Sequence, residues 1–534
     1  MTITADGDIT KATKITKITT VSLWSLCLGD LRGRAVARAL AASLFVAAGC
    51  THTPPTTAPK PNLRAERALA SDLDRIFGAP VMAQGLWGVE VKSLDTGRLL
   101  YARNARRLLM PASNMKIVTL AAAAETLGWD YRFKTTIETD GAIEGGALKG
   151  NLIVRGAGDP TINNRDNRAR AMFDEWASAL KAAGVTRIDG NVVADASAFD
   201  RRGLGQGWSW DYLQYGYAAP VGALEFNEDI ATLTVRPGGK PGDAAQLELP
   251  PSTGLGLVHQ VVTGEAGTAT TIDFERVPDS NYLDVTGSIA ADAKPATREV
   301  AVANPALYFA HSLTLALIER GIPVRGLPVV FERSSLLAPL PRTAIVESQS
   351  PPLREIATTM MKVSQNLYAE TLLKAVGAAG GAIGTTDAGR AAAQKIFETW
   401  GIPASSYVQA DGSGLSRYDF VTAEMIVTLL ERMYKDPRHH DAFVATLPIA
   451  GKDGTISTRM KSTRAEANAL AKTGSIANVR ALSGYVRTRD GETVVFSILA
   501  NSFTIPAATV NWIADLAVER LSNYSRVPIR VPDR

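Results

Sequence analysis

Ser113 and Lys116 are two residues whose types and spacing could do chemistry. They precede an Ala-rich apolar run, residues 117–124, which predicts a helix that begins close to the serine. At a spacing of three, the lysine amine lies on the same helix face as the serine hydroxyl and can take its proton. The positive end of the helix dipole favours a developing alkoxide and a neutral amine. The pair therefore predicts an activated serine nucleophile.

By itself this pair is a weak signal, because a serine cap followed by a lysine is common at helix starts. Two downstream triplets strengthen it. Ser364-Gln-Asn366 interrupts a helical pattern, which predicts a junction between helices, and Lys472-Thr-Gly474 lies where a strand is expected. Each triplet also has a purely structural interpretation: Ser364 and Asn366 as helix-cap residues, and Lys472-Thr-Gly474 as a solvated edge strand. Three such elements in order rarely coincide by chance.

Composition narrows the function classes. The 534 residues are 46% hydrophobic and 21% charged, which is ordinary globular composition for two or three domains. Residues 1–50 hold six Lys or Arg against three Asp, so the net charge of +4 leaves about +1 for the remainder, with no basic tract. Nucleic acid is therefore a poor candidate partner. Both cysteines, Cys27 and Cys50, precede the globular part, which can form no disulfide and no Cys-ligated metal site.

Residues 32–50 have the pattern of an export signal. Three arginines, Arg32, Arg34 and Arg38, precede an apolar run, Ala39–Ala48, that is too short to span a membrane. We therefore expect an exported, periplasmic protein.

Small residues directly before Cys50 resemble a bacterial lipoprotein signal, in which the cysteine is lipidated and becomes the mature N-terminus. Ala47 departs from that signal, which favours Leu there, so cleavage without lipidation is the alternative. Residues 1–30 fit a signal poorly and are consistent with a start codon assigned too far upstream. Residues 51–62, rich in Pro and Thr, predict a tether.

The two ends of the globular part predict one antiparallel sheet. A helix begins near Leu63 and a hairpin spans residues 87–101. At the other end, Asp490-Gly491 joins two apolar runs in a strong hairpin signal, and a helix spans about residues 504–521.

Between Ser113 and Ser364 lie 250 residues, far more than one connection needs, so we expect an insertion. From residue 131 the composition favours strands, with one helix near residues 169–183. The Pro- and Gly-rich stretch 235–257 is consistent with either a nested small domain or long loops.

The sequence resembles the three-domain D-alanyl-D-alanine carboxypeptidase/endopeptidases, which are low-molecular-mass class C penicillin-binding proteins. The three motifs stand in the family's order, and the match covers residues 63–521. Further matching segments are 156–160, 189–195, 207–211, 218–220, 411–417 and 447–454. The resemblance implies an α+β fold, with a transpeptidase/β-lactamase-like antiparallel sheet between helices. That catalytic domain would comprise residues 63–130 and 300–534, and residues 131–299 would form an inserted β-rich domain that carries a nested small domain.

The resemblance also implies site residues that share the task of acyl transfer. They are the nucleophile (Ser113), its base (Lys116), a proton relay (Ser364), a clamp for the substrate amide (Asn366), a source of positive potential (Lys472) and a strand that binds the terminal carboxylate (Thr473, Gly474 and Ser475). The backbone N–H groups of Ser113 and Ser475 would form the oxyanion hole.

A further set, Asp211, Tyr217 and Arg417, would bind the diamino-acid side chain of a wall peptide. That side chain ends in an ammonium and a carboxylate, so an acid and a guanidinium suit it. Asp211 could equally be a turn residue after Trp210, or the family's acid could align with Tyr212. Arg417 could be a surface ion-pair partner.

The predicted function is a serine D,D-peptidase that cleaves peptidoglycan peptides as a carboxypeptidase and a cross-link endopeptidase. It would form an acyl-enzyme at Ser113, be inhibited by β-lactams, and need no cofactor or metal. A membrane contact would come from a lipid on Cys50.

Two alternatives stay open: a β-lactamase-like hydrolase, which would not need the insertion, and a catalytically silent wall-binding lipoprotein. A Ser-His-Asp hydrolase and a zinc peptidase fit poorly, because the sequence has neither Gly-x-Ser-x-Gly nor His-Glu-x-x-His.

Overall fold

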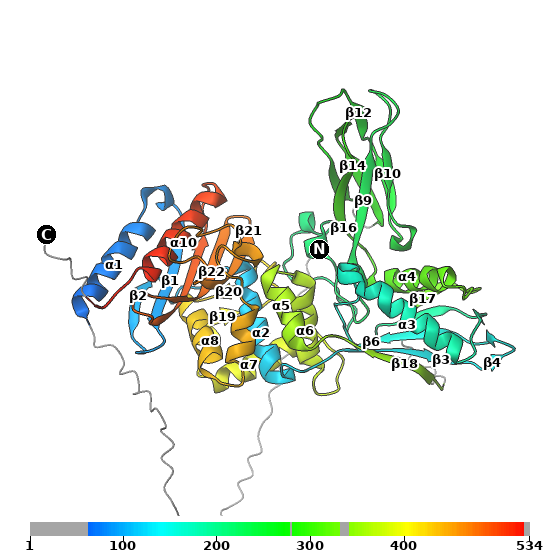
Figure 1. Cartoon of the computed structure of the whole chain (residues 1–534), viewed down its shortest axis with the longest axis horizontal. Coiled ribbons are helices and arrows are strands. Elements are labelled where there is room, and N and C mark those ends of the chain that lie inside the picture. The colour runs from blue at the N-terminus through cyan, green and yellow to red at the C-terminus, as the bar shows by residue number, and fades with distance from the viewer. Residues whose placement is uncertain (1–61, 278–279, 332–340, 528–534) are drawn as a thin grey trace, which may run out of the picture. The chain divides into compact units, whose positions relative to one another are not determined.

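A computed structural model describes residues 62–277, 280–331 and 341–527 (Figure 1). The predicted export signal, Cys50 and nearly all of the tether lie outside these ranges, so what was predicted for them stays a prediction. Among the described residues, no helix combines the length and the apolar character that a membrane span requires.

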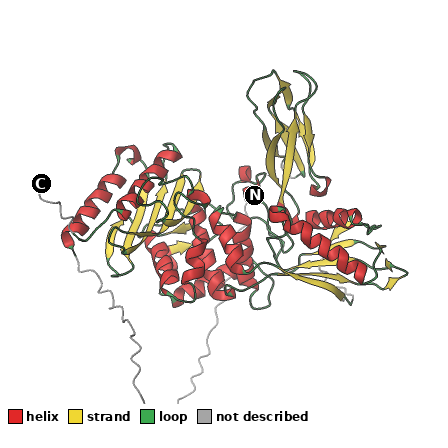
Figure 2. Ribbon diagram, viewed as in Figure 1, coloured by secondary structure: helices red, strands yellow, loops and turns green. Residues whose placement is uncertain are grey.

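A five-stranded antiparallel sheet is built from both ends of the globular part, which confirms the prediction (Figures 1 and 2). Its order is β2-β1-β23-β22-β21, so the N-terminal hairpin pairs with the C-terminal one along β1 and β23. The strands are β1 (Leu86–Ser93), β2 (Leu99–Arg103), β21 (Leu470–Ile476), β22 (Val479–Arg487) and β23 (Thr493–Asn501).

Helices cover both faces of this sheet, because successive side chains of a strand point to opposite faces. In β22, Leu482 and Val486 are buried in the apolar cluster of α1 (Leu63–Phe77) and α10 (Ala507–Ser522). Ala481 and Tyr485, on the other face, are buried with α2 (Met115–Leu127) and α8 (Ala423–Lys435). Figure 1 shows α1 and α10 beside each other along the sheet.

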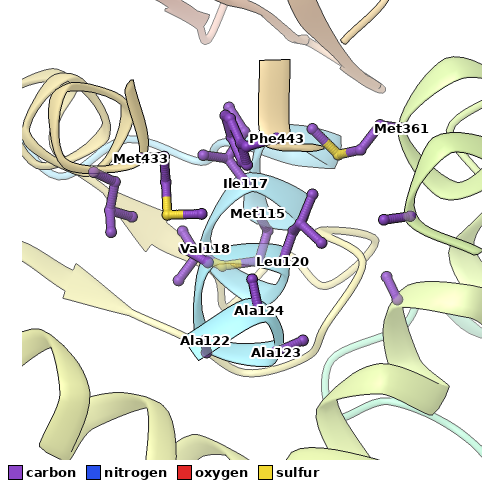
Figure 3. Close-up of a cluster of buried hydrophobic side chains, with 14 of the residues drawn as sticks. Met115, Ile117, Val118, Leu120, Ala122, Ala123, Ala124, Met361, Met433 and Phe443 are labelled. Atoms are coloured by element: carbon purple, nitrogen blue, oxygen red, sulfur yellow. The ribbon is translucent and has the colours of Figure 1, made fainter. Parts of the chain in front are cut away.

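The central helix is α2 (Met115–Leu127), which begins directly after a 3₁₀ turn that contains Ser113. Every residue from Met115 to Ala124 is buried, so the helix is enclosed on all sides rather than amphipathic. Figure 3 shows its apolar side chains among those of Met361, Met433 and Phe443, which come from α5, α8 and α9. Ser113 is the one residue between Pro111 and Ala124 that is partly exposed.

Further helices pack around α2 and carry Ser364. The residue lies in the short connection between α5 and α6, at the predicted helix junction, and its φ of 64° is rare for a serine. These helices are α5 (Leu353–Lys362), α6 (Asn366–Ala378), α7 (Thr386–Thr399), α8 (Ala423–Lys435) and α9 (His440–Thr446), with a short ladder of β19 (Tyr407–Val408) and β20 (Phe420–Val421).

A second five-stranded sheet lies in the β-rich stretch, in the order β17-β8-β6-β3-β18. It packs against α3 (Arg168–Ala182) and α4 (Pro305–Glu319). The bounds of α3 are close to those of the helix predicted near residues 169–183. Its strands are β3 (Lys134–Thr139), β6 (Leu152–Gly156), β8 (Val192–Asp195), β17 (Pro328–Val330) and β18 (Thr343–Gln349), with β4 (Ile143–Glu144), β5 (Ala147–Leu148) and β7 (Arg187–Ile188) in a small sheet nearby.

This sheet uses residues that the sequence analysis assigned to the catalytic domain. β18 pairs with β3, and Phe309 and Leu313 of α4 are buried in the core of this sheet. An apolar helix pattern predicts that a face is buried but not against which sheet, so the boundary at residue 299 could not be set from periodicity.

Residues 230–301 form three small sheets with an apolar core of their own, which includes Leu233, Leu283 and Val300. The strands are β9 (Ile230–Arg236), β10 (Gln246–Glu248), β11 (Gly256–His259), β12 (Val262–Gly264), β13 (Asp273–Arg276), β14 (Tyr282–Thr286), β15 (Ser288–Ala290) and β16 (Ala296–Ala301). The stretch 235–257 thus contributes β10 and part of β11 between its loops.

Candidate active site

The lysine amine reaches the serine hydroxyl. Lys116 Nζ lies 2.9 Å from Ser113 Oγ, one helical turn away. The same nitrogen lies 2.6 Å from Asn366 Oδ1 and 2.8 Å from the carbonyl oxygen of Ser413. The contact with Asn366 joins the first two motifs of the sequence. The contact with Ser413 comes from a loop that the sequence analysis named only as part of a matching segment.

These three contacts orient the amine. A neutral primary amine has two hydrogens and one lone pair, whereas the Asn366 amide oxygen and the Ser413 carbonyl can only accept. If these two oxygens take the two hydrogens, the lone pair is left pointing at Ser113 Oγ. The arrangement can therefore draw the hydroxyl proton from Ser113 to Lys116.

Burial supplies the neutral amine. Lys116 is fully enclosed by the core around α2, and burial lowers the pKa of its amine to about 7, although nearby carboxyl groups oppose the shift. An ordinary lysine titrates at about 10.4 and would be almost entirely protonated at neutral pH. A substantial fraction of Lys116 is therefore available as a base near pH 7.

The second and third motifs meet at a separate hydrogen bond. Lys472 Nζ donates to Ser364 Oγ at 2.8 Å and to the carbonyl of Thr473 at 2.9 Å. Burial, together with the positive charge of Lys116, lowers the pKa of Lys472 well below its usual range. The site thus holds two enclosed amines, each on a serine hydroxyl.

Gly474 allows β21 to approach the nucleophile. A Cβ added to Gly474 would lie 2.5 Å from the Pro111 carbonyl oxygen, closer than Cβ atoms of folded chains approach, and in tight contact with the Ala112 Cβ at 3.2 Å. The strand can therefore lie against the turn that holds Ser113 only because this residue has no side chain. Next to it, Thr473 Oγ1 donates to Thr455 Oγ1 at 2.7 Å.

Comparisons with known proteins show the family of the chain. The model of the D-Ala-D-Ala carboxypeptidase 3 (S13) family matches residues 69–522. The chain belongs to this family. A D-alanyl-D-alanine carboxypeptidase of Actinomadura sp. (strain R39) is 34% identical over 475 residues, which cover 86% of this chain and 85% of the relative.

Relatives from Haemophilus influenzae support the family assignment and the fold. The D-alanyl-D-alanine carboxypeptidase DacB of that organism is 30% identical over 431 residues, covering 78% of this chain and 85% of the relative. The crystal structure of its penicillin-binding protein 4 (dacB) superposes with a TM-score of 0.75 at 28% identity, covering 85% of this chain and 99% of that one. The S13 chain is therefore an α+β protein of the fold that the sequence predicted.

The residues predicted for the diamino-acid side chain have other partners here. Arg417 donates from its guanidinium to the Ala477 carbonyl at 3.2 Å, in the turn that follows β21. Asp211 is exposed in a short 3₁₀ turn and accepts a hydrogen bond from the Ser209 hydroxyl. The Tyr217 carbonyl accepts from Asn366 Nδ2 at 2.7 Å, so the backbone of Tyr217 reaches the base's own partner. Their predicted role in recognition stays a prediction.

Three polar groups at the site escaped the sequence analysis. Ser413 contributes only its carbonyl, which leaves no trace in residue type. Thr455 contacts the third motif from 18 residues upstream, directly after the matching segment 447–454, to which no role was given. Glu370 is buried four residues after Asn366 on α6, and that helical spacing was the available signal for it.

Lys116 should titrate near pH 7, because its enclosure disfavours the ammonium. The measurement is ¹³C NMR of protein labelled at the lysine ε-carbon, followed from pH 5 to pH 10. Lys116→Arg, which removes the resonance, assigns it. A titration midpoint above pH 9 would contradict the neutral amine.

Proposed function

We propose that this S13 protein is a serine D,D-peptidase that forms an acyl-enzyme at Ser113. The observation that carries the proposal is the contact of 2.9 Å between Lys116 Nζ and Ser113 Oγ, in which the amine is buried and its two hydrogens have other acceptors. Its substrate class is the D-Ala-D-Ala end of peptidoglycan stem peptides and the equivalent bond in cross-links.

In the first step, Ser113 Oγ attacks the carbonyl carbon of the scissile amide while its proton passes to the lone pair of Lys116. Backbone N–H groups of Ser113 and Ser475 would stabilise the oxyanion, as in the family. Collapse of the intermediate breaks the C–N bond, and the leaving amine takes the proton from Lys116 by way of Ser364, which returns Lys116 to its neutral form. Water then hydrolyses the ester with Lys116 again as base, which regenerates Ser113.

Lys472 fits the recognition of a terminal carboxylate. Without substrate, its burial beside a second amine disfavours the ammonium. A substrate carboxylate bound at Thr473 and Ser475 would supply the missing negative charge and favour protonated Lys472. Binding of the correct substrate would then charge Lys472, which holds Ser364 in place by its hydrogen bond of 2.8 Å.

Named relatives support a β-lactam-sensitive enzyme. A structure of the Haemophilus influenzae penicillin-binding protein 4 is described as complexed with a β-lactam, and it matches this chain with a TM-score of 0.70 at 27% identity. We propose that β-lactams acylate Ser113 here. Slow release of the bound drug would distinguish this enzyme from a β-lactamase-like hydrolase.

The test of the nucleophile is Ser113→Ala. It should abolish covalent labelling by a fluorescent penicillin and cleavage of D-Ala-D-Ala peptides, while the thermal midpoint stays close to wild type because only one oxygen atom is lost. Ser178→Ala, on the exposed surface of α3, is the matched control and should keep both activities. Labelling that persists in Ser113→Ala would rule out the assignment.

The predicted subsite for a diamino-acid side chain belongs to the same proposal. Arg417 would pair with the carboxylate of that side chain, with Asp211 and Tyr217 on the side of the insertion. The exposure of Asp211 and Tyr217 supports access for a ligand. The hydrogen bond from Ser209 to Asp211 also agrees with the alternative of a simple turn residue.

Arg417→Ala should therefore lower kcat/KM on wall peptides by about tenfold or more, the cost expected for losing a charge-assisted hydrogen bond. Penicillin acylation should change little, because penicillin lacks that side chain. Arg464→Ala removes an exposed arginine that, like Arg417, donates to a backbone carbonyl, and it controls for a general loss of stability. Equal losses on both substrates would show that Arg417 supports the turn at Ala477 instead.

We propose that the protein acts in the periplasm and that a lipid on Cys50 anchors it. The basis is the sequence alone, since this segment lies outside the described residues. Cys50→Ala should move the protein from the membrane fraction to the soluble periplasmic fraction with unchanged activity on soluble peptides. An unchanged membrane fraction would exclude this anchor.

We also propose a domain organisation in which the insertion runs from residue 131 to about residue 349, with residues 230–301 as its nested part. The pairing of β18 with β3 supports the later boundary, and the separate apolar core supports the nested part.

A further inference from the structure

We propose that Glu370 is a positioning residue for the base: it holds the loop whose carbonyl aims the lone pair of Lys116 at Ser113. The inference rests on the proposed function, because it requires that Lys116 take the proton of Ser113. Glu370 lies outside the three motifs, on a buried part of α6 that would otherwise be assigned only to the core.

Both oxygens of the Glu370 carboxyl group are used by the loop. The backbone N–H of Gly412 donates to Oε2 at 2.9 Å, and the N–H of Ser413 donates to Oε1 at 2.8 Å. The carbonyl of Ser413 accepts from Lys116 Nζ at 2.8 Å. A single residue thus lies between the carboxyl group and the base, and a displacement of that residue moves an acceptor of the amine.

Glu370 and Asn366 both connect α6 to the amine of Lys116. They are four residues apart and therefore lie on one face of the helix. Asn366 contacts Lys116 directly at 2.6 Å, and Glu370 acts through Ser413. Asn366 Oδ1 and the Ser413 carbonyl oxygen accept the two hydrogens of the neutral amine. Because α6 carries Asn366 and also holds Ser413 through Glu370, the direction of the lone pair depends on α6.

The loop fits tightly between α6 and the turn that carries Ser113. A Cβ at Gly412 would lie 2.5 Å from the Ala369 carbonyl oxygen, and one at Gly414 would lie 1.8 Å from the Ala112 carbonyl oxygen. Thr119 Oγ1 also donates to the Gly412 carbonyl at 2.7 Å. With backbone packed on both sides, the loop has little room to compensate for the loss of Glu370.

Charge at this site agrees with the same role. Burial and the nearby Asp411 raise the pKa of Glu370, whereas the N–H groups of Gly412 and Ser413 that donate to it favour its ionised form. The charged groups that interact with Glu370 are Asp411 from the loop and Lys116 from α2. Asp419 and Lys472 interact in turn with Lys116. The carboxylate of Glu370 favours the protonated amine of Lys116, as does the acceptor at Ser413 that Glu370 holds. Removal of Glu370 therefore lowers the pKa of Lys116 through both effects.

Glu370→Gln is the test, because the amide keeps the shape of the side chain but turns one acceptor into a donor that faces an N–H group. Stopped-flow acylation by a chromogenic cephalosporin, from pH 5 to pH 9, separates the acylation rate constant from the affinity of the noncovalent complex. We expect the rate constant to fall by about tenfold or more, as for a misaligned catalytic group. The noncovalent affinity should stay within about twofold, and the pH midpoint of acylation should move to lower pH.

Thr371→Val is the matched control. Thr371 is the next residue on α6, is fully buried, and donates to Glu225 Oε1 at 2.8 Å, so its loss also deprives a buried carboxyl group of a hydrogen bond. The acylation rate constant and the pH midpoint of this variant should match wild type even where its thermal midpoint falls.

Three results would overturn the assignment. They are an acylation rate constant for Glu370→Gln within twofold of wild type, an unshifted pH midpoint, and an equal effect in Thr371→Val. If Glu370→Gln does not fold, Glu370→Asp decides, because its shorter carboxylate cannot hold both N–H groups and should lower the rate constant at unchanged affinity. Ser113→Ala separates the two proposals: labelling of that variant would refute the proposed function, whereas failure of Glu370 alone would leave that function intact.

Discussion

The burial of one amine is the interaction on which the rest of the structure depends. Lys116 is enclosed because α2 is apolar on every side and is surrounded by α5, α6, α8, α9 and the sheet. Enclosing an amine disfavours its charged form, and here that penalty lowers the pKa of Lys116 to about 7, as its proposed role as a base requires. The same cost would destabilise a core in which the lysine had no acceptors, so the three oxygens around Nζ serve both stability and chemistry.

Convergence of distant segments on this amine requires backbone to touch backbone. Gly474 in β21 meets the Pro111 carbonyl, and Gly414 in the loop meets the Ala112 carbonyl. A side chain at either position would collide with these carbonyl oxygens and push the strand or the loop away from the serine turn. Ser364 is held in the left-handed region of φ, and its hydroxyl is fixed by Lys472. Unusual backbone of this kind is common where surrounding packing fixes a functional group.

Residues of the proposed insertion are tied to the loop around Ser413 by hydrogen bonds. Trp208 Nε1 donates to Asp411 Oδ2 at 2.8 Å, and Ser416 Oγ donates to the Gln206 carbonyl at 2.6 Å. Asp411 also accepts from the N–H groups of Gly414 and Ser416, each at 2.7 Å, which shapes the loop that Glu370 holds. A substrate that contacts these residues of the proposed insertion would therefore act on the same loop whose Ser413 carbonyl contacts Lys116.

The sequence by itself determined the local chemistry and the local elements. It predicted the helix that begins close to Ser113, the junction at Ser364, the hairpin at Asp490-Gly491 and the sheet made from both ends of the globular part, because apolar periodicity and turn residues act over a few positions. Only the tertiary structure decided that Asn366 and the Ser413 carbonyl, 250 and 297 residues from Lys116, take its two hydrogens. It also decided that β18 belongs with β3. Contacts of this kind depend on which buried surfaces pack together, and a backbone carbonyl has no residue type by which the sequence could reveal it.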